Sequence, residues 1–168
     1  MFLYSGNPLI FARNYQCQRS WMTRLRKFLR LASRERRLLI RAALLLGTIG
    51  LGVRLLPFAT IQRLLARLMK GPARGRQGRQ SSPERIAWAV VVASQVVPGS
   101  RTCLIRALAV QTLLARAGLP ARCHIGVAKG EGGRLEAHAW VENQDRIVIG
   151  GGGLSRYTRL VTFEGERP

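Results

Sequence analysis

Cysteine is scarce in this chain. The 168 residues contain three, Cys17, Cys103 and Cys123, an odd number at unrelated spacings. This pattern argues against a disulfide framework and fits a reducing, cytoplasmic environment. Counted together with the two histidines, His124 and His138, the last two cysteines could supply four zinc ligands. The gaps fit no common zinc module, and the adjacent Cys123 and His124 would point to opposite faces of a strand. We therefore expect no metal and no cofactor.

Acidic residues are also few. Eight Asp or Glu stand against 28 Lys or Arg, which gives a formal net charge of +20. Residues 1–80 hold 17 of the basic residues and one acid, whereas residues 81–168 hold 11 basic residues and seven acids. The front half could owe this charge to an arginine-rich composition alone, or it could bind an acidic peptide, an anionic membrane surface or nucleic acid.

Long hydrophobic runs are missing as well, and no segment reads convincingly as a signal peptide. The longest uncharged apolar stretch, residues 42–53, lies between Arg41 and Arg54. It is shorter than the roughly 20 residues that a membrane-spanning helix needs. We interpret it first as a buried helix, second as a helix on a membrane surface and third as a span. The localisation that we expect is cytoplasmic, with membrane association as an alternative.

The chain divides into four regions. Residues 1–20 show no period, and residues 21–70 form a basic helical region, with helices expected at 21–32, 33–56 and 59–69. Residues 71–84, rich in Gly, Arg and Gln, are expected to be a flexible linker. Residues 85–168 form the presumed catalytic domain. Its first helix is expected to begin at Pro83, at the end of the linker, and to run to about Val97.

A helix is predicted to begin near Cys103. The turn cluster Pro98-Gly99-Ser100 precedes it, Ser100 or Thr102 can cap it, and Gly118 can end it in a left-handed conformation. Cys103 then lies in the first turn. Unpaired N–H groups and the helix dipole favour a negative group there, which raises the thiolate fraction of a cysteine.

A small set of strands follows. In one of them Glu136, His138, Trp140 and Glu142 alternate with apolar residues, so His138 can point into a cleft with Trp140 beside it. The other expected strands are residues 123–128, 146–150 and 157–163, with turns at 130–133 and 143–145. A thiolate near an imidazole is the activated pair of cysteine peptidases and transglutaminases. We expect His124 and Cys123 to be structural.

Several motifs in this order closely resemble the leader-peptidase family of lasso-peptide biosynthesis, the B protein or its C-terminal half. They are C-L-I-R-A-L-A from Cys103, L-L at 113–114, G-L-P from Gly118, H-I-G-V from His124 and A-H-A-W-V-E from Ala137. The helical first half, with R-L-L-P-F from Arg54, is similar to the stand-alone form of that protein. The resemblance implies an α+β, transglutaminase-like and papain-like core. In it, the helix that bears Cys103 packs on a small antiparallel sheet that bears His138, behind an N-terminal helical region.

The resemblance also implies an activity and partners. Cys103 would be the nucleophile and His138 the general acid and base of a cysteine peptidase that cleaves the leader from a lasso precursor peptide. A separate leader-recognition protein would present the precursor, and an ATP-dependent lasso cyclase would take the product. We expect no specific nucleic acid, and peripheral contact with a membrane is an alternative.

The sequence departs from the family at the third catalytic position, where an aspartate on the next strand orients the histidine. If Glu142 pairs with Arg146 or Ile147, the residue opposite His138 is Gly150 or Gly151. The only aspartate, Asp145, stands at the turn and is a weak candidate for the orienting group. A backbone carbonyl, a water or a group from elsewhere could orient the ring instead. Gln95 is a further candidate, as an oxyanion donor.

Two rival functions therefore stay open. One is a catalytically silent scaffold of the same fold, which the glycines at 150 and 151 favour. The other is a basic protein that binds membranes or nucleic acid, which the charge of the front half favours.

Overall fold

The structure, a computed structural model, describes residues 32–70 and 82–164. The expectations for residues 1–31 and for most of the linker lie outside the described residues. Residues 37–168 form one compact unit, separate from residues 1–36. The helices that precede the linker therefore belong to the same unit as the sheet.

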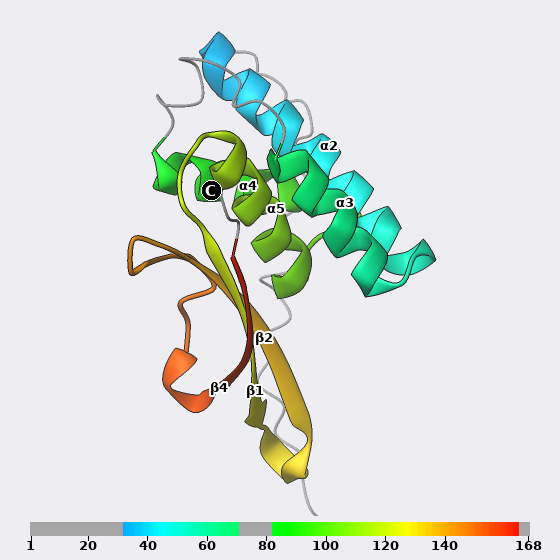
Figure 1. Cartoon of the computed structure of the whole chain (residues 1–168), viewed down its shortest axis with the longest axis vertical. Coiled ribbons are helices and arrows are strands. Elements are labelled where there is room, and N and C mark those ends of the chain that lie inside the picture. The colour runs from blue at the N-terminus through cyan, green and yellow to red at the C-terminus, as the bar shows by residue number, and fades with distance from the viewer. Residues whose placement is uncertain (1–31, 71–81, 165–168) are drawn as a thin grey trace, which may run out of the picture. The chain divides into compact units, whose positions relative to one another are not determined.

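The described part of the chain contains four α-helices and a four-stranded antiparallel sheet (Figure 1), so an α+β fold is confirmed. The helices are α2 (Ser33–Leu55), α3 (Phe58–Lys70), α4 (Pro83–Ser94) and α5 (Cys103–Arg116). The strands are β1 (Arg122–Lys129), β2 (Leu135–Asn143), β3 (Arg146–Ile149) and β4 (Thr158–Glu164). Two short 3₁₀ turns, η2 (Glu131–Gly133) and η3 (Leu154–Arg156), lie in the connections.

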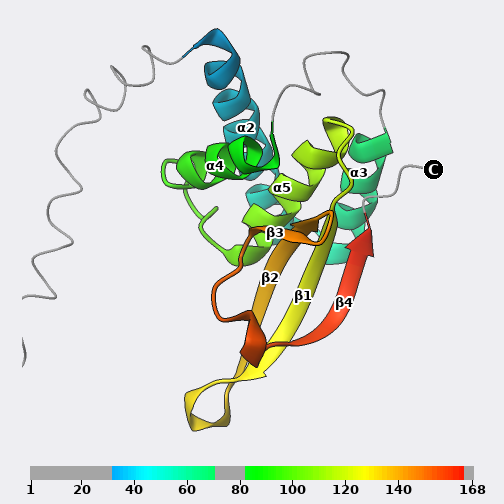
Figure 2. The ribbon, with the colours of Figure 1, turned by 90° about the vertical axis from the view of Figure 1, so that its left-hand side faces the viewer.

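The strand order is β3-β2-β1-β4 (Figure 2). Glu142 pairs with Ile147, one of the two partners considered, and the register shifts between Glu142 and Val141, which pairs with Ile149. Its turn residues Gln144 and Asp145 have φ angles of 48° and 62°, as the two-residue turns that suit twisted strands require. Strand β3 ends at Ile149, one residue earlier than predicted, because Gly150 has a φ of 82° and leaves the extended conformation.

Helix α5 has both of its predicted ends. The Thr102 side chain accepts a hydrogen bond from the Ile105 N–H at 3.4 Å and caps the first turn. At the other end Gly118 has a φ of 78°. The Leu119 N–H donates to the Leu114 carbonyl and the Gly118 N–H to the Ala115 carbonyl, which is a Schellman motif. These ends fix Cys103 as the first residue of the helix.

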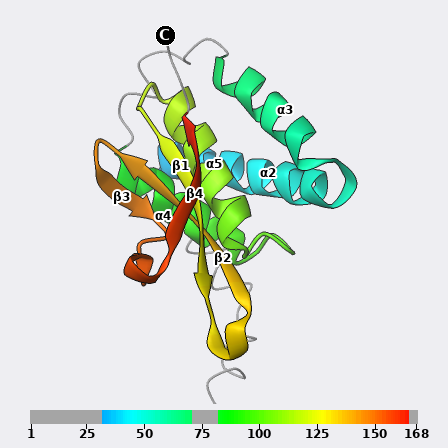
Figure 3. The same ribbon diagram turned by 60° about the horizontal axis from the view of Figure 1, so that its bottom comes forward.

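Helix α5 is the centre of the unit. It contacts α3, α4, β1 and β2 (Figures 2 and 3). Nine of its fourteen residues are buried, around most of its circumference, among them Leu108, Val110 and Leu114. A helix that is apolar all round must be covered on all sides. The sheet covers α5 on one side, and the other helices cover the rest.

Helix α2 is buried on one side only. Leu39, Ala42, Leu46 and Ile49 recur at helical spacing and are at most 7 % exposed. The opposite side carries exposed large apolar residues, so the first interpretation of residues 42–53, a buried helix, is correct for one face alone. By length and composition α2 could also cross a membrane, a test that the core helices of soluble proteins pass too.

A buried polar cluster supports one face of the sheet. The Glu142 carboxylate accepts hydrogen bonds from His124 Nε2 at 3.0 Å and from Trp140 Nε1 at 3.1 Å. It also lies 3.5 Å from the Arg159 guanidinium. His124 is buried, and its Nδ1 accepts from the Thr162 hydroxyl at 2.9 Å. The neutral imidazole therefore has both ring nitrogens satisfied.

Burial controls the charge of His124. Desolvation lowers its pKa, and the nearby Glu142 carboxylate opposes this only in part. The pKa of Glu142 is itself lowered. Burial raises it, but the hydrogen bonds from Trp140 and His124 and the charges of His124 and Arg159 outweigh burial. The cluster is therefore most stable as a carboxylate with a neutral imidazole.

We predict that the stability of the protein falls as the pH drops below about 6.5, the ordinary pKa of histidine. Because the folded pKa of His124 is lowered, the unfolded state binds more protons there, and unfolding becomes easier as the pH decreases. Urea unfolding at pH 8, 7, 6 and 5 measures this effect. Glu142 contributes a similar loss only below its ordinary value of about 4.5, outside this range.

His124→Gln is the control for this pH dependence. It should lower the stability at every pH, because Gln cannot reproduce both imidazole contacts, but it should flatten the decline between pH 7 and pH 5. An unchanged slope in the variant would show that another group titrates.

Candidate active site

Cys103 stands at the first position of α5 and is partly exposed. The backbone N–H groups of a first helical turn have no partners within the helix and attract a negative group. The loop before it is held by Ser100, which is buried and whose hydroxyl lies 2.7 Å from the Val97 carbonyl and 3.2 Å from the Ser94 carbonyl. The thiol therefore has a fixed position at the positive end of the helix.

Arginines surround the start of α5. Arg106 donates to the Arg101 carbonyl at 2.6 Å, and Arg101 donates to the Gln95 carbonyl at 3.3 Å. The Arg54 guanidinium lies against Gly99, so close that a Cβ on that glycine would be 2.5 Å from Nη2. Gln95, the candidate oxyanion donor, is the exposed C-cap of α4.

Cys123 has a different environment. It is fully buried on β1, and its pKa is raised to about 12, first by desolvation and second by the charge of Cys103. Cys123 is therefore a neutral thiol in the core, as expected. Of the two cysteines in the described residues, Cys103 is the one whose surroundings suit a nucleophile.

The His138 imidazole is oriented by a backbone carbonyl. His138 Nε2 lies 2.8 Å from the Gly150 oxygen. A carbonyl oxygen can only accept, so Nε2 carries the hydrogen and, in the neutral ring, Nδ1 carries the lone pair. This contact does the work that an orienting carboxylate does in a catalytic triad, except that it adds no negative charge. This contact corresponds to the carbonyl alternative of the sequence analysis.

Two aromatic rings hold the imidazole in place. The Trp140 ring is nearly parallel to it, with centroids 6.4 Å apart, and the Tyr157 ring lies 5.1 Å away. Trp140 is fixed in turn by its hydrogen bond to Glu142. The alternation of β2 predicted Trp140. Nothing in the sequence indicated Tyr157, because it follows a loop whose path depends on the tertiary fold.

Asp145 lies elsewhere. Its carboxylate is 86 % exposed and lies 3.5 Å from the Arg122 guanidinium. His138 and Asn143, the residue at which the turn begins, are five positions apart on β2, roughly 17 Å along the strand. Asp145 therefore pairs with Arg122, whereas the hydrogen-bond partner of His138 is the Gly150 carbonyl.

Position 150 has no room for the family's aspartate. A Cβ there would lie 2.7 Å from the Ala139 carbonyl oxygen, and a φ of 82° suits glycine. At Gly151 a Cβ would lie 3.2 Å from the Ile147 side chain. At position 150 the backbone of this loop therefore favours glycine over aspartate.

Cys103 and His138 lie on α5 and β2, which pack against each other. Within the residues that the structure describes, no hydrogen bond joins the thiol to the imidazole. The pairing of β1 with β2 puts His138 on the face of the sheet that carries His124 and Trp140, whereas Cys123, whose pKa the charge of Cys103 raises, lies on the other face. In the same residues no three His, Cys, Asp or Glu side chains come together as metal ligands.

A family model described as the transglutaminase-like superfamily matches residues 43–162. The match runs from α2 to β4 and includes Cys103 and His138. No curated protein and no solved structure matches the chain. Since the family model covers most of the sequence, the chain belongs to the transglutaminase-like superfamily.

Proposed function

We propose that this chain is a cysteine peptidase that removes the leader peptide from a lasso-peptide precursor. Its superfamily includes cysteine peptidases. The motifs from Cys103 to Glu142 resemble those of the lasso leader peptidases, and this resemblance is the reason for the proposed substrate. The observation that carries the proposal is the contact of His138 Nε2 with the Gly150 carbonyl oxygen, from which the tautomer of the ring follows. With its hydrogen on Nε2, the ring offers Nδ1 as the base.

The mechanism assigns one role to each residue. The Cys103 thiolate attacks the carbonyl carbon of the scissile bond, and the His138 imidazolium gives its Nδ1 proton to the leaving amine. The C–N bond breaks and a thioester to Cys103 remains. His138 then takes a proton from water, which attacks the thioester and releases the acid and the thiol. Throughout, the Gly150 carbonyl holds Nε2–H.

The partners follow from the same resemblance. A separate leader-recognition protein presents the precursor, and an ATP-dependent cyclase takes the freed core. The reaction needs no metal and no cofactor, because thiol and imidazole supply both the nucleophile and the proton transfer.

One observation favours a second function, a catalytically silent scaffold. His138 has a neutral carbonyl where the family has a carboxylate, and no hydrogen bond joins it to Cys103 in the described residues. Cleavage of the precursor, followed by mass spectrometry with the recognition protein present, separates the two functions. A scaffold would leave the precursor intact.

We predict that Cys103→Ala abolishes leader removal and leaves the fold intact, because the nucleophile is lost. Cys103→Ser should be nearly as inactive, since a hydroxyl is a poor nucleophile in a site suited to a thiolate. The expected loss is several orders of magnitude, as for other nucleophiles of this kind. Precursor cleavage rates measure it.

Cys123→Ala is the matched control. It removes a buried thiol and should lower stability, but the folded fraction should still cleave. Normal cleavage by Cys103→Ala would refute the mechanism.

A second prediction concerns the Gly150 carbonyl. Gly150→Ala should displace it, because the new Cβ would meet the Ala139 carbonyl oxygen. Turnover should fall by roughly 10–100-fold, as when other orienting partners of histidine are lost. The pH profile of kcat should change with it, since the imidazole loses its fixed tautomer.

Two variants control this experiment. Gly152→Ala should behave like the wild type, because no atom lies within 4 Å of the added Cβ. Asp145→Asn should also keep its activity. A collapse of activity in folded Asp145→Asn would show that the aspartate, and not the carbonyl, orients His138.

We further predict that the leader is bound by a complex. A fluorescently labelled leader should bind weakly to this chain alone and more tightly when the recognition protein is added. Fluorescence anisotropy measures both affinities. Tight, sequence-specific binding by the isolated chain would contradict the proposed division of labour.

A further inference from the structure

Helix α2 carries an exposed apolar ridge that consists of Ile40, Leu44, Leu51 and Leu55. The exposed fractions of these side chains are 48, 66, 59 and 70 %. At about 100° per residue they lie within roughly 60° of one another, on the side opposite the buried stripe of α2. Exposed apolar residues that are this contiguous mark an interaction surface.

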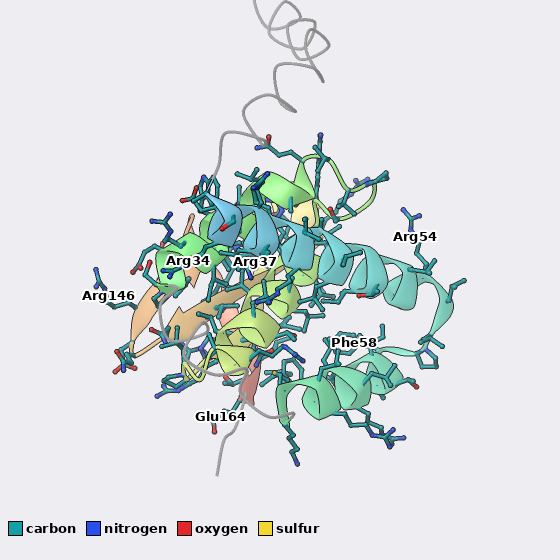
Figure 4. The ribbon with its side chains drawn as sticks, turned by 90° about the horizontal axis from the view of Figure 1, so that it is seen from above. Arg34, Arg37, Arg54, Phe58, Arg146 and Glu164 are labelled. Carbon is teal, nitrogen blue, oxygen red and sulfur yellow. The ribbon has the colours of Figure 1, made fainter. Side chains whose placement is uncertain are left out.

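The stretch of chain that contains the ridge carries only positive charges. Residues 37–82 contain no Asp or Glu and nine Lys or Arg. Arg37 and Arg41 lie on the exposed side of α2, next to the ridge, and Figure 4 shows Arg37 and Arg54 toward opposite ends of the helix. Helix α3 adds three exposed cations, Arg63, Arg67 and Lys70. An apolar ridge bordered by cations complements an anionic lipid surface, which offers acyl chains beneath negative headgroups.

Helix α2 is nevertheless unsuited to cross a bilayer. Its uncharged stretch between Arg41 and Arg54 has 12 residues, or about 18 Å of helix, whereas the hydrocarbon core is about 30 Å thick. Its other side is part of the core of the protein, where Gly50 lies near Ile105 of α5 and Gly52 near Ile61 of α3. Because one side of α2 is buried in the protein, only its other side can contact a membrane, and the helix then lies flat on the membrane surface.

We infer that the exposed ridge of α2 binds the surface of anionic membranes and holds this unit at the lipid interface. The inference does not depend on the proposed peptidase activity. The ridge enters the boundary between headgroups and acyl chains, and the arginines beside it contact phosphates. Ile105, in the first turn of α5, lies near Gly50 on the inner side of α2, so α2 would lie between the membrane and the first turn of α5.

Flotation of the full chain with lipid vesicles tests this inference. The protein should float with phosphatidylcholine vesicles that contain 30 mol % phosphatidylglycerol. It should float poorly with pure phosphatidylcholine and less well at 0.5 M salt, because salt screens the charges. Leu44→Gln combined with Leu51→Gln should weaken binding at least about tenfold, since two apolar anchors are lost.

The matched control is Leu135→Gln combined with Leu160→Gln. These two leucines are 74 and 61 % exposed, but they lie on β2 and β4. The control should bind like the wild type, and circular dichroism should show that both double variants are folded. Equal binding by the two double variants would overturn the inference, because another part of the chain would then be the anchor.

Three other results would also overturn it. One is the absence of flotation with anionic vesicles. Another is wild-type protein that resists extraction by alkaline carbonate, which would identify a span. The third is a dimer that the Leu44→Gln, Leu51→Gln variant dissociates while vesicles are not bound, because a second copy would then cover the ridge.

Discussion

The fold depends on one constraint, the burial of α5 around most of its circumference. Its residues leave no polar side that could face water, so other elements have to surround it. The sheet, α3 and α4 do so. This requirement packs α5 against β2, and the hydrogen bonds of Ser100 fix the loop that leads into Cys103. The candidate nucleophile is therefore positioned by the hydrophobic core rather than by polar contacts of its own.

The histidine is positioned by a different kind of interaction. Hydrogen bonds within the sheet hold Glu142, His124 and Trp140, the Trp140 ring lies beside the imidazole, and the Gly150 carbonyl fixes its tautomer. Among residues 32–70 and 82–164, no ion pair involves His138. A site of this kind can set the geometry of a thiol–imidazole pair, but it gives less stabilisation to the imidazolium than a carboxylate would. The Gly150 carbonyl can hold the His138 ring in one orientation, but it cannot neutralise the positive charge of the imidazolium.

Helix α2 has two apolar sides in different environments. Its inner side is apolar and packs near α5 and α3, and its outer side is apolar without a protein partner in the described residues. Apolar side chains on both sides make the helix resemble a membrane span in composition. Arg41 and Arg54 limit the uncharged stretch, and the packing of the inner side decides that the helix belongs to the compact unit.

The sequence by itself determined the local structure. Gly118 specified the end of α5, Ser100 and Thr102 were the candidates for its start, and the alternation of β2 specified which side chains share a face with His138. These features depend on neighbours in the chain, so periodicity and capping residues predict them. Only the tertiary structure decided which side of α2 is exposed, that Tyr157 lies against His138, and that the backbone at Gly150 takes the place of an aspartate. Each of these depends on contacts between segments distant in the sequence, or on a φ angle that a glycine permits but does not require.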